Sequence, residues 1–404
     1  MVSGRDVVFI GIQPWDIKIG SNCKNIALEL SKNNRVLYVN APLDRKTAFI
    51  ERHSEGVKKR KSIIKGEAPD LEKINSNLHT FYPKKMIESI NWLPHGSIYR
   101  LLNKRNAKLF FNEVKRVLKD LSFENYVLFN DCSMFLGYHA TEMLDPSLSL
   151  YYIRDNLVSQ YYFGKHGKTM EPELAAKYDV VMANSNFLSE YLGKYNPHSY
   201  MVGQGCDLDA FKPDNVSKDA PLDLKPIPRP IIGYLGYLTT LRLSIELIVE
   251  LAKSRPDYSF VLVGPEDTAF KDSELHNMAN VHFLGSKESN VLSDYIGHFD
   301  VAINPQTVNG MTIGNYPRKI DEYLALGKPT VATATPAMQY FEDTVYLAED
   351  AEDYASKIDL ALDEDNKELA VKRIKCAEGH TWGNHVENMG KVIEKIMKEK
   401  GKAI

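Results

Sequence analysis

The stretch DVAINPQTVNGMTIGNYPRKIDEYLALGKPTVAT, residues 300–333, decides the fold. Residues 300–303 are apolar and short, as in a buried strand, and a polar loop containing glycine follows at 306–317. Pro317 is expected to open a helix that runs to Leu326, because proline is tolerated at the first helical position. A second apolar strand is expected at 330–333. A strand, a loop, a helix and a strand in this order predict a βαβ unit, whose parallel strands place ligands at their carboxyl ends.

The first turn of the predicted helix carries two basic residues, Arg318 and Lys319. Positive side chains at a helix N-terminus oppose the helix dipole. An anion held between them and the free N–H groups of the helix would interact favourably with both. The pattern therefore predicts a phosphate site here, with two solvated surface charges as the alternative.

The segment PRKIDEYLALGKPTVAT, residues 317–333, resembles the donor-site signature of GT-B glycosyltransferases of the retaining family-4 type. It is most similar to bacterial cell-surface polysaccharide and teichuronic-acid-type enzymes. The resemblance implies that Glu322 binds the ribose hydroxyls of a sugar nucleotide. The family motif has another glutamate eight positions earlier, which holds the donor sugar, and this chain has Gly314 there. Thr312 or Asn315 is the expected substitute.

Length and composition are those of a globular enzyme. The chain has 404 residues, enough for two to three domains, with 25% charged and 44% hydrophobic residues. Its four cysteines are far apart and lack metal-site spacing, which is typical of a reducing compartment. No apolar run approaches the roughly 18 residues needed to span a bilayer. The first residues are interpreted as a strand and not as a signal peptide, so we expect a cytoplasmic protein.

Positive charge is concentrated in the N-terminal part. Residues 1–125 hold 23 Lys and Arg against 13 Asp and Glu, a net charge of +10, and the remainder holds 27 against 40, a net charge of −13. Basic clusters at 58–65, 84–85 and 100–108 alternate with apolar residues such as Trp92. This pattern predicts attachment to an anionic membrane surface, at the inner face of the plasma membrane, and a lipid-linked acceptor. Nucleic acid is disfavoured as a partner because no nucleic-acid-binding motif is present; a solvated helical face is the alternative.

The N-terminal segments predict a first βαβ unit, with strands at 6–12 and 35–40 and a helix between them. Gly20, in the loop before the helix, is expected on the acceptor side, with a turn glycine as the alternative. Because no GxGxxG is present, a nicotinamide or flavin site is disfavoured.

The predicted strand at 149–154 delivers Asp155 at its carboxyl end. In the resembled family this strand end carries a His or Asp against the reacting sugar, so Asp155 is the candidate catalytic residue, as a polar contact or base near the acceptor. A helix-capping aspartate is the alternative. Tyr161, Tyr162 and His166 are expected to line the acceptor side, although a lone histidine is commonly a surface residue.

Asp207 and Asp209 imitate a metal-binding Asp-x-Asp pair. They lie in GQGCDLDAF, residues 203–211, which resembles the hinge segment of the family, so we interpret them as structural and expect no metal and no cofactor.

Residues 215–230, with four prolines, predict a linker, and a second βαβ series follows it. Glycines after strands let a ligand approach the backbone, so further donor-binding residues are expected at the strand ends. These are Gly236, Tyr237, Gly264 and Asn304. Where similar enzymes carry an Arg and a Lys for the diphosphate, this chain has Thr239, Thr240 and Arg242. Part of the diphosphate role is therefore assigned to Arg318 and Lys319.

The resulting hypothesis is an α/β protein of the GT-B fold, with two Rossmann-like domains facing across a cleft. Residues 1–214 would bind the acceptor, 215–380 the nucleotide sugar, and 381–404 would form a helix that crosses back to the first domain. The predicted activity is metal-independent transfer, with retention, from a UDP-linked sugar to a glycan or lipid-linked acceptor. A UDP-sugar 2-epimerase and a non-catalytic membrane-associated scaffold that binds sugar nucleotides are the alternatives.

Overall fold

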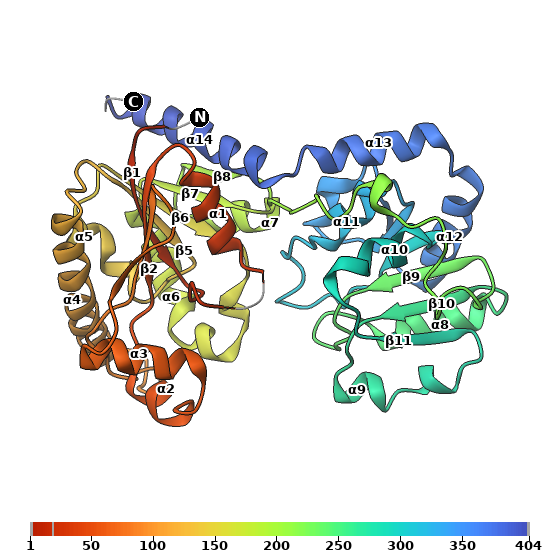
Figure 1. Ribbon diagram of the computed structural model, residues 1–404, viewed down its shortest axis with the longest axis horizontal. Coiled ribbons are helices and arrows are strands. Elements are labelled where there is room, and N and C mark those ends of the chain that lie inside the picture. Colours follow the sequence, from red (N-terminus) through yellow and green to blue (C-terminus); the bar gives the residue numbers. More distant parts are fainter. Residues whose placement is uncertain (1–2, 18–19, 402–404) are drawn as a thin grey trace. The chain divides into compact units, whose positions relative to one another are not determined.

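The computed structural model describes residues 3–17 and 20–401 (Figure 1). They form two compact units: unit 1 contains the chain up to Gly205 together with the segment from Trp382 onward, and unit 2 contains Cys206–Thr381. The first boundary therefore lies nearer the N-terminus than the predicted 214, and the second directly follows the predicted 380.

The predicted linker at 215–230 belongs to unit 2. Leu224 is buried, the Ser217 N–H donates to Asp294 at 2.7 Å, and Lys287 pairs with Asp223 at 2.6 Å. The expectation of a free linker was wrong because the segment has its own polar and apolar partners on this unit.

Unit 1 is built on an eight-stranded sheet in the order β3-β4-β2-β1-β5-β6-β7-β8. Its strands are β1 Asp6–Gly11, β2 Arg35–Asn40, β3 Leu71–Lys73, β4 Leu78–Phe81, β5 Val127–Asp131, β6 Leu148–Ile153, β7 Val180–Ala183 and β8 Ser199–Met201. All neighbours are parallel except β3 and β4. The central strands β1, β5, β6 and β7 are buried along their whole length and mainly apolar, as expected when both sheet faces are covered. Their carboxyl ends meet at one edge, where β1, β5 and β6 deliver the loops discussed below.

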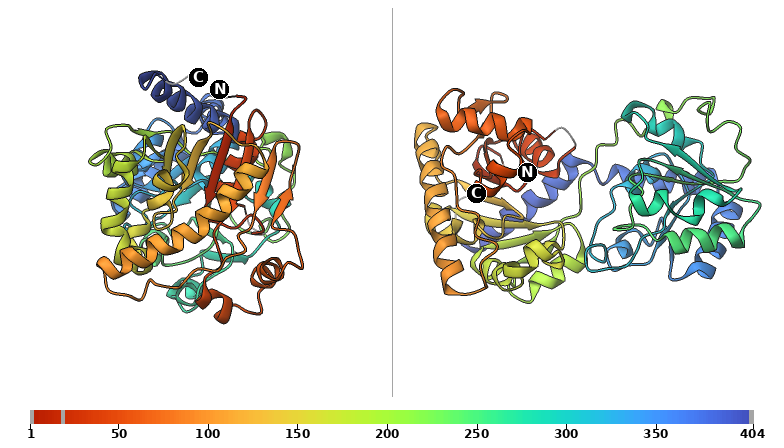
Figure 2. Two further views of the ribbon diagram at one scale, coloured as in Figure 1. Left: turned by 90° about the vertical axis from the view of Figure 1, so that its left-hand side faces the viewer. Right: turned by 90° about the horizontal axis from the view of Figure 1, so that it is seen from below.

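Helices cover both faces of this sheet. Buried side chains of α4 Ser97–Asp120, α5 Ala140–Leu144, α6 Tyr161–Lys177 and α7 Asn186–Gly193 pack on one face. Those of α1 Asn22–Leu30 and α14 Trp382–Glu399 pack on the other. Figure 2 shows the long helix α4 in front of the sheet in its left view. The predicted return of the C-terminal helix to the first domain is confirmed. Two short helices, α2 Arg45–Ile50 and α3 Glu55–Lys65, follow β2.

Unit 2 contains a six-stranded, all-parallel sheet in the order β11-β10-β9-β12-β13-β14. Its strands are β9 Ile231–Leu235, β10 Ser259–Val263, β11 Val281–Gly285, β12 Val301–Asn304, β13 Thr330–Thr333 and β14 Tyr346–Ala348. One face carries α8 Ile245–Ser254, α9 Thr268–Lys271 and α12 Ala351–Glu364. The other carries α10 Leu292–Gly297, α11 Lys319–Ala325 and α13 Lys367–Glu378. Two parallel-sheet units with helices on both faces confirm the predicted α/β fold class.

One helix prediction was wrong in its bounds. Helix α11 begins at Lys319, with Arg318 as its N-cap, so Pro317 lies before the helix and does not open it. Helix α6 begins at Tyr161 and contains Pro172 in its interior. Among the described residues no helix combines the length and the apolar character needed to cross a bilayer.

Candidate functional site

Two glycines bring backbone segments into contact at the carboxyl edge of the sheet in unit 2. Gly236 follows β9 and Gly264 follows β10, with φ of +150° and +148°. The Gly236 N–H donates to the Val263 carbonyl at 2.9 Å. A Cβ on Gly264 would lie 1.9 Å from the Gly236 carbonyl oxygen, so this approach requires glycine.

Lys319 lies against this backbone crossing. Its ammonium donates to the Tyr234 hydroxyl and lies 3.8 Å from the centre of the same ring. A Cβ on Gly236 would come within 2.8 Å of the Lys319 Nζ. Burial lowers the pKa of Lys319 to about 7; the charge of Glu322 opposes this shift, and the charge of Arg242 adds to it. A cation is therefore held at the strand edge in a poorly solvated place.

Glu322 stands one turn further along α11. Burial raises the pKa of Glu322 to about 7, and the charges of Arg318 and Lys319 counteract the shift. At this edge of unit 2, an acidic and a basic side chain thus both have pKa values shifted to about 7. Displaced groups of this kind are typical of ligand sites.

Asn304 ends β12 at the same edge. Its backbone N–H donates to the Tyr354 hydroxyl at 3.1 Å. Its side-chain Nδ2 is buried and has no hydrogen-bond partner within residues 3–17 and 20–401. Tyr237, directly after Gly236, is 54% exposed.

The loop before α11 holds the two residues suggested as substitutes for the missing glutamate. The buried Thr312 hydroxyl donates to the Thr307 carbonyl and accepts from the Asn309 N–H at 3.0 Å. It is occupied in shaping the loop. The Asn315 side chain is partly buried, and its backbone N–H donates to the Thr312 carbonyl at 3.0 Å. Of the two side chains, that of Asn315 is less involved in hydrogen bonds of the loop.

Asp321 is an acidic residue of this motif whose structural role the sequence did not reveal. It is fully buried, lies 2.7 Å from Nδ1 of His380, and accepts from the Tyr316 hydroxyl at 3.0 Å. Burial raises the pKa of Asp321, and the hydrogen bond to His380 opposes the shift. The pair ties α11 to the end of α13, which fixes the helix that carries Lys319 and Glu322.

In unit 1, Asp155 belongs to a charged network at the carboxyl edge of β5 and β6. Arg154 donates from Nη1 to Asp155 at 3.0 Å and from Nε to the buried Asp131 at 3.0 Å. The Cys23 thiol also donates to Asp131, at 2.6 Å, and burial raises its pKa to about 12, so it stays protonated. The Asp155 side chain is 33% exposed and is held at the sheet edge by Arg154.

His166 is not at the surface. It is fully buried, its ring stacks on Tyr99 with 3.5 Å between centroids, and its Nε2 lies 3.2 Å from the Asn91 carbonyl oxygen. The expectation of an acceptor-side or surface histidine was wrong because His166 lies on the inner side of α6. Tyr161 and Tyr162, at the start of that helix, are exposed. Gly20 is exposed and has open space where a Cβ would stand, so no close contact requires glycine there.

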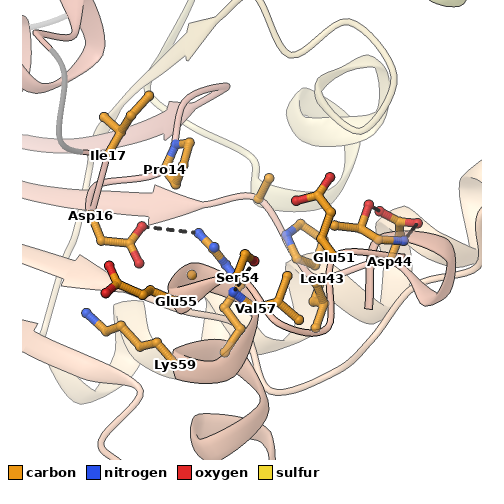
Figure 3. Close-up of a pocket in the computed structure, with 15 residues that line it drawn as sticks. Pro14, Asp16, Ile17, Leu43, Asp44, Glu51, Ser54, Glu55, Val57 and Lys59 are labelled. Atoms are coloured by element: carbon orange, nitrogen blue, oxygen red, sulfur yellow. Dashed lines mark hydrogen bonds and ion pairs between the residues drawn. The ribbon is translucent and has the colours of Figure 1, made fainter. Parts of the chain in front are cut away.

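A pocket of about 630 Å³ lies beside the loops that follow β1 and β2 (Figure 3). Its walls come from the β1–α1 loop, the β2–α2 connection and the first half of α3. The lining residues are Pro14, Asp16, Ile17, Ala41, Pro42, Leu43, Asp44, Thr47, Glu51, Ser54, Glu55, Gly56, Val57, Lys59 and Arg60. None of them was assigned a donor, acceptor or catalytic role from the sequence, and Lys59 and Arg60 belong to the basic cluster at 58–65.

The described part of the chain contains no group of three or more His, Cys, Asp or Glu side chains that could hold a metal ion. Asp209 pairs with Lys212 at 2.6 Å on the surface. The absence of metal from the reaction stays a prediction.

Comparisons with known proteins concern the family and the fold of this chain. Residues 229–364 match the family model described as glycosyl transferases group 1. The chain is 26% identical over 192 residues, 46% of its length, to a Bacillus subtilis (strain 168) protein named as the teichuronic acid biosynthesis glycosyltransferase TuaH. The chain spans about half the length of this curated relative, 47%.

Solved structures share the fold over nearly the whole chain. Sucrose-phosphate synthase from Thermosynechococcus elongatus is similar with a TM-score of 0.68 at 16% identity, covering 98% of this chain and 100% of the other. HepE from Anabaena, in complex with UDP and glucose, has a TM-score of 0.60 at 17% identity, covering 96% and 98%. These likenesses confirm the predicted fold, and the family match and the curated relative confirm the predicted resemblance to glycosyltransferases.

The structure brings together Gly236, Gly264, Lys319 and Glu322, and their predicted role in binding a donor stays a prediction. It adds two residues that were not assigned a role. Tyr234 was hidden in an apolar strand run, and only the fold shows that its hydroxyl contacts Lys319. Arg242 was noted in its loop, but its effect on the pKa of Lys319 follows only from the three-dimensional arrangement.

Proposed function

We propose that this chain, which carries a group 1 glycosyltransferase segment on a GT-B fold, transfers a sugar from a nucleotide diphosphate sugar to an acceptor hydroxyl. Unit 2 binds the donor, which we take to be UDP-linked, and unit 1 binds the acceptor. Transfer proceeds with retention and without a metal ion. The observation that carries this proposal is the cluster of Lys319, Tyr234, Gly236 and Glu322 at one strand edge.

The donor fits this cluster through complementary charge. A diphosphate beside Gly236 and Gly264 would meet backbone that carries no side chains, next to the Lys319 ammonium. Arg318 and Arg242 add positive charge nearby, and together these cations stabilise the leaving diphosphate as its charge develops. Glu322, as a carboxylate, accepts hydrogen bonds from the ribose hydroxyls. The unpartnered Nδ2 of Asn304 is a further donor for the ligand.

Asp155 is the proposed catalytic residue on the acceptor side. Arg154 fixes its carboxylate at the sheet edge, and Asp131 fixes Arg154. A carboxylate held in this way polarises an acceptor hydroxyl or accepts its proton during transfer.

Replacing Glu322 tests the donor site. Glu322→Ala removes charge-assisted hydrogen bonds worth roughly 1.5–3 kcal/mol, so the affinity for UDP-glucose should fall about 10- to 100-fold. The melting temperature should change little, because the pKa of Glu322 is raised by burial and the free protein gains little from its charge. Titration calorimetry and thermal unfolding measure the two effects. An unchanged affinity would remove Glu322 from the site.

Unit 1 also presents a surface suited to a bilayer. Three of its segments expose large apolar side chains, namely Phe49, Ile50, Trp92, Ile98, Leu101, Tyr161 and Tyr162. These segments are neighbours: the Lys46 N–H donates to Ser89 at 2.8 Å, and Asn91 donates to the Tyr162 carbonyl at 3.0 Å. Exposed basic residues flank them: Arg45, Lys46, Arg52, Lys104, Arg105 and Lys168. We infer that the enzyme works at an anionic membrane surface on a lipid-linked acceptor.

Vesicle flotation tests the membrane contact. The protein should float with vesicles containing anionic phosphatidylglycerol and not with pure phosphatidylcholine, and salt should weaken binding. Trp92→Ser combined with Phe49→Ser should abolish flotation. Both side chains are over 70% exposed, so the double variant removes apolar surface and little of the hydrophobic core. Leu222→Ser in unit 2, where Leu222 is 91% exposed, is the matched control. Equal binding to both vesicle types, or no loss in the double variant, would contradict the membrane proposal.

One observation favours a second candidate, a scaffold that binds sugar nucleotides without catalysis. Position 314, where the resembled family has a glutamate for the donor sugar, is a buried glycine. A scaffold would bind UDP-glucose yet show neither transfer nor hydrolysis of the donor. Conversion of UDP-N-acetylglucosamine to its 2-epimer in the same assay would identify the epimerase alternative.

A further inference from the structure

We propose that the pocket between the β1–α1 loop, the β2–α2 connection and α3 binds an uncharged sugar unit of an extended acceptor, at a distance from the bond that is formed. That the ligand is part of an acceptor rests on the proposed function. The charge and the chemistry of the ligand follow from the pocket itself.

The pocket lies to one side of the proposed catalytic residue. It opens beside the carboxyl ends of β1 and β2, whereas Asp155 follows β6, and the strand order is β2-β1-β5-β6. Neighbouring strands are about 4.8 Å apart, so two to three spacings separate the pocket from Asp155, about 10–14 Å. This distance exceeds the width of one sugar ring. A ligand that fills the pocket and also reaches Asp155 must therefore carry more than one unit.

Two carboxylates at the mouth, Glu51 and Glu55, are exposed. Asp16 is less exposed and pairs with Arg60 at 3.7 Å. A dashed line in Figure 3 marks an ion pair of Asp16. Carboxylate oxygens only accept hydrogen bonds, and sugar hydroxyls can donate to them in charge-assisted bonds. Pro14, Ile17, Leu43 and Val57 supply an apolar wall for the C–H face of a ring.

The lining disfavours an anion. It contains four acidic residues and two basic ones, a net charge of −2, within an N-terminal part whose net charge is +10. Both basic residues already have acidic partners, because Arg60 pairs with Asp16 and Lys59 lies 3.0 Å from Glu72. A phosphate or uronic acid would lose hydration without gaining an unengaged cation. The pocket therefore selects neutral units, and the anionic part of a lipid-linked acceptor must lie elsewhere.

Gly56 allows the pocket to be filled with little risk to the fold. It lines the pocket from α3, and a Cβ added at this position would have Arg60 Nη1 as its nearest atom, at 3.5 Å, an ordinary contact. Gly56→Trp places a large ring at the mouth and removes a glycine that weakens the helix. Lys58→Trp, at an exposed position of the same helix outside the lining, is the matched control.

Saturation-transfer NMR on the full chain tests the proposal with neutral disaccharides (cellobiose, maltose and N,N′-diacetylchitobiose) and with a disaccharide that carries glucuronate. At least one neutral disaccharide should bind to the unaltered protein and to Lys58→Trp, the glucuronate compound should not bind, and Gly56→Trp should abolish the signal. Glu51→Lys combined with Glu55→Gln should enable binding of the glucuronate compound. Absence of binding by every neutral disaccharide, equal binding of the anionic one, or an unchanged signal in Gly56→Trp would overturn the proposal.

UDP-glucose binding is measured in the same samples and should be the same in all these variants, since they alter only unit 1. If the unaltered protein binds UDP-glucose but none of the neutral disaccharides, the proposal for the pocket is rejected and the proposed donor site is not. Failure to bind UDP-glucose in the unaltered protein would instead count against the proposed donor site.

Discussion

Donor binding should depend on pH through Lys319. In the free protein burial lowers the pKa of Lys319 from 10.5 to about 7, so this side chain is about half protonated at neutral pH. A bound diphosphate would favour the ammonium form. Above pH 7, binding must therefore be accompanied by the uptake of a proton, and the affinity should fall.

The size of the effect follows from the two pKa values. If the complex restores the pKa of Lys319 to its ordinary value of 10.5, the apparent affinity is proportional to the fraction of the free protein in which Lys319 is protonated. Between pH 7 and pH 9 this amounts to a loss of about 50-fold, or roughly 2.3 kcal/mol. Glu322 adds an acid limb, because its pKa of about 7 means that the carboxylate is progressively protonated below neutrality. The affinity should therefore be highest near pH 7.

Titration calorimetry with UDP-glucose from pH 6 to pH 9, in two buffers of different ionisation enthalpy, measures both the affinity and the proton uptake. UDP-glucose is suitable because its diphosphate does not titrate in this range. Lys319→Met should weaken binding at pH 7 and remove the alkaline limb. Lys287→Met, which changes a surface lysine of unit 2 paired with Asp223, is the control and should keep it. A loss of less than threefold between pH 7 and pH 9 in the unaltered protein, or an alkaline limb that persists in Lys319→Met, would refute this reasoning.

Two further predictions concern stability. Burial raises the pKa of the fully buried Glu171 from 4.5 to about 7. Because the unfolded chain loses this proton at lower pH, Glu171 should lower the free energy of unfolding by about 3 kcal/mol between pH 4.5 and pH 7. Urea unfolding should show a weaker pH dependence for Glu171→Gln, and an equal pH dependence in both proteins would contradict the prediction. Gly264→Ala places a Cβ 1.9 Å from the Gly236 carbonyl oxygen at a φ of +148°, and should lower the free energy of unfolding by at least about 2 kcal/mol. Gly285→Ala, at a φ of +66° with open space around it, should lower it by only about 1–2 kcal/mol. Equal melting temperatures for the two variants would show that the backbone crossing is not tight.

The sequence predicted the central strands of both sheets because they are short apolar runs between turn residues, and it did not predict β3, β4 or β14. In a parallel sheet with both faces covered, such runs are unambiguous, as in residues 7–10 and 259–263. The donor role of Glu322 was predicted from the resemblance of residues 317–333 to a family signature and stays a prediction, whereas the strand, loop and helix around it follow each other within one local stretch. Local order was enough for the elements in both cases.

The sequence failed where partners are distant along the chain. The Lys319–Tyr234 contact joins residues 85 positions apart, and Tyr234 has the apolar neighbours of any core tyrosine. His166 was misjudged because its burial depends on Tyr99, in another helix. The pocket of unit 1 is formed by three segments whose individual sequences show no binding motif. The prolines of residues 215–230 suggested a linker, and only the contacts of Leu224 and Ser217 with unit 2 correct this.

Binding of a nucleotide diphosphate sugar by unit 2 without a metal ion is the central claim. The most direct measurement is titration calorimetry of the full chain at pH 7 with UDP-glucose and GDP-glucose, once in the presence of EDTA and once with Mg²⁺. We predict binding of UDP-glucose with the same affinity in both conditions and weaker binding of GDP-glucose. Binding that requires Mg²⁺, or the absence of binding by both nucleotide sugars, would contradict it.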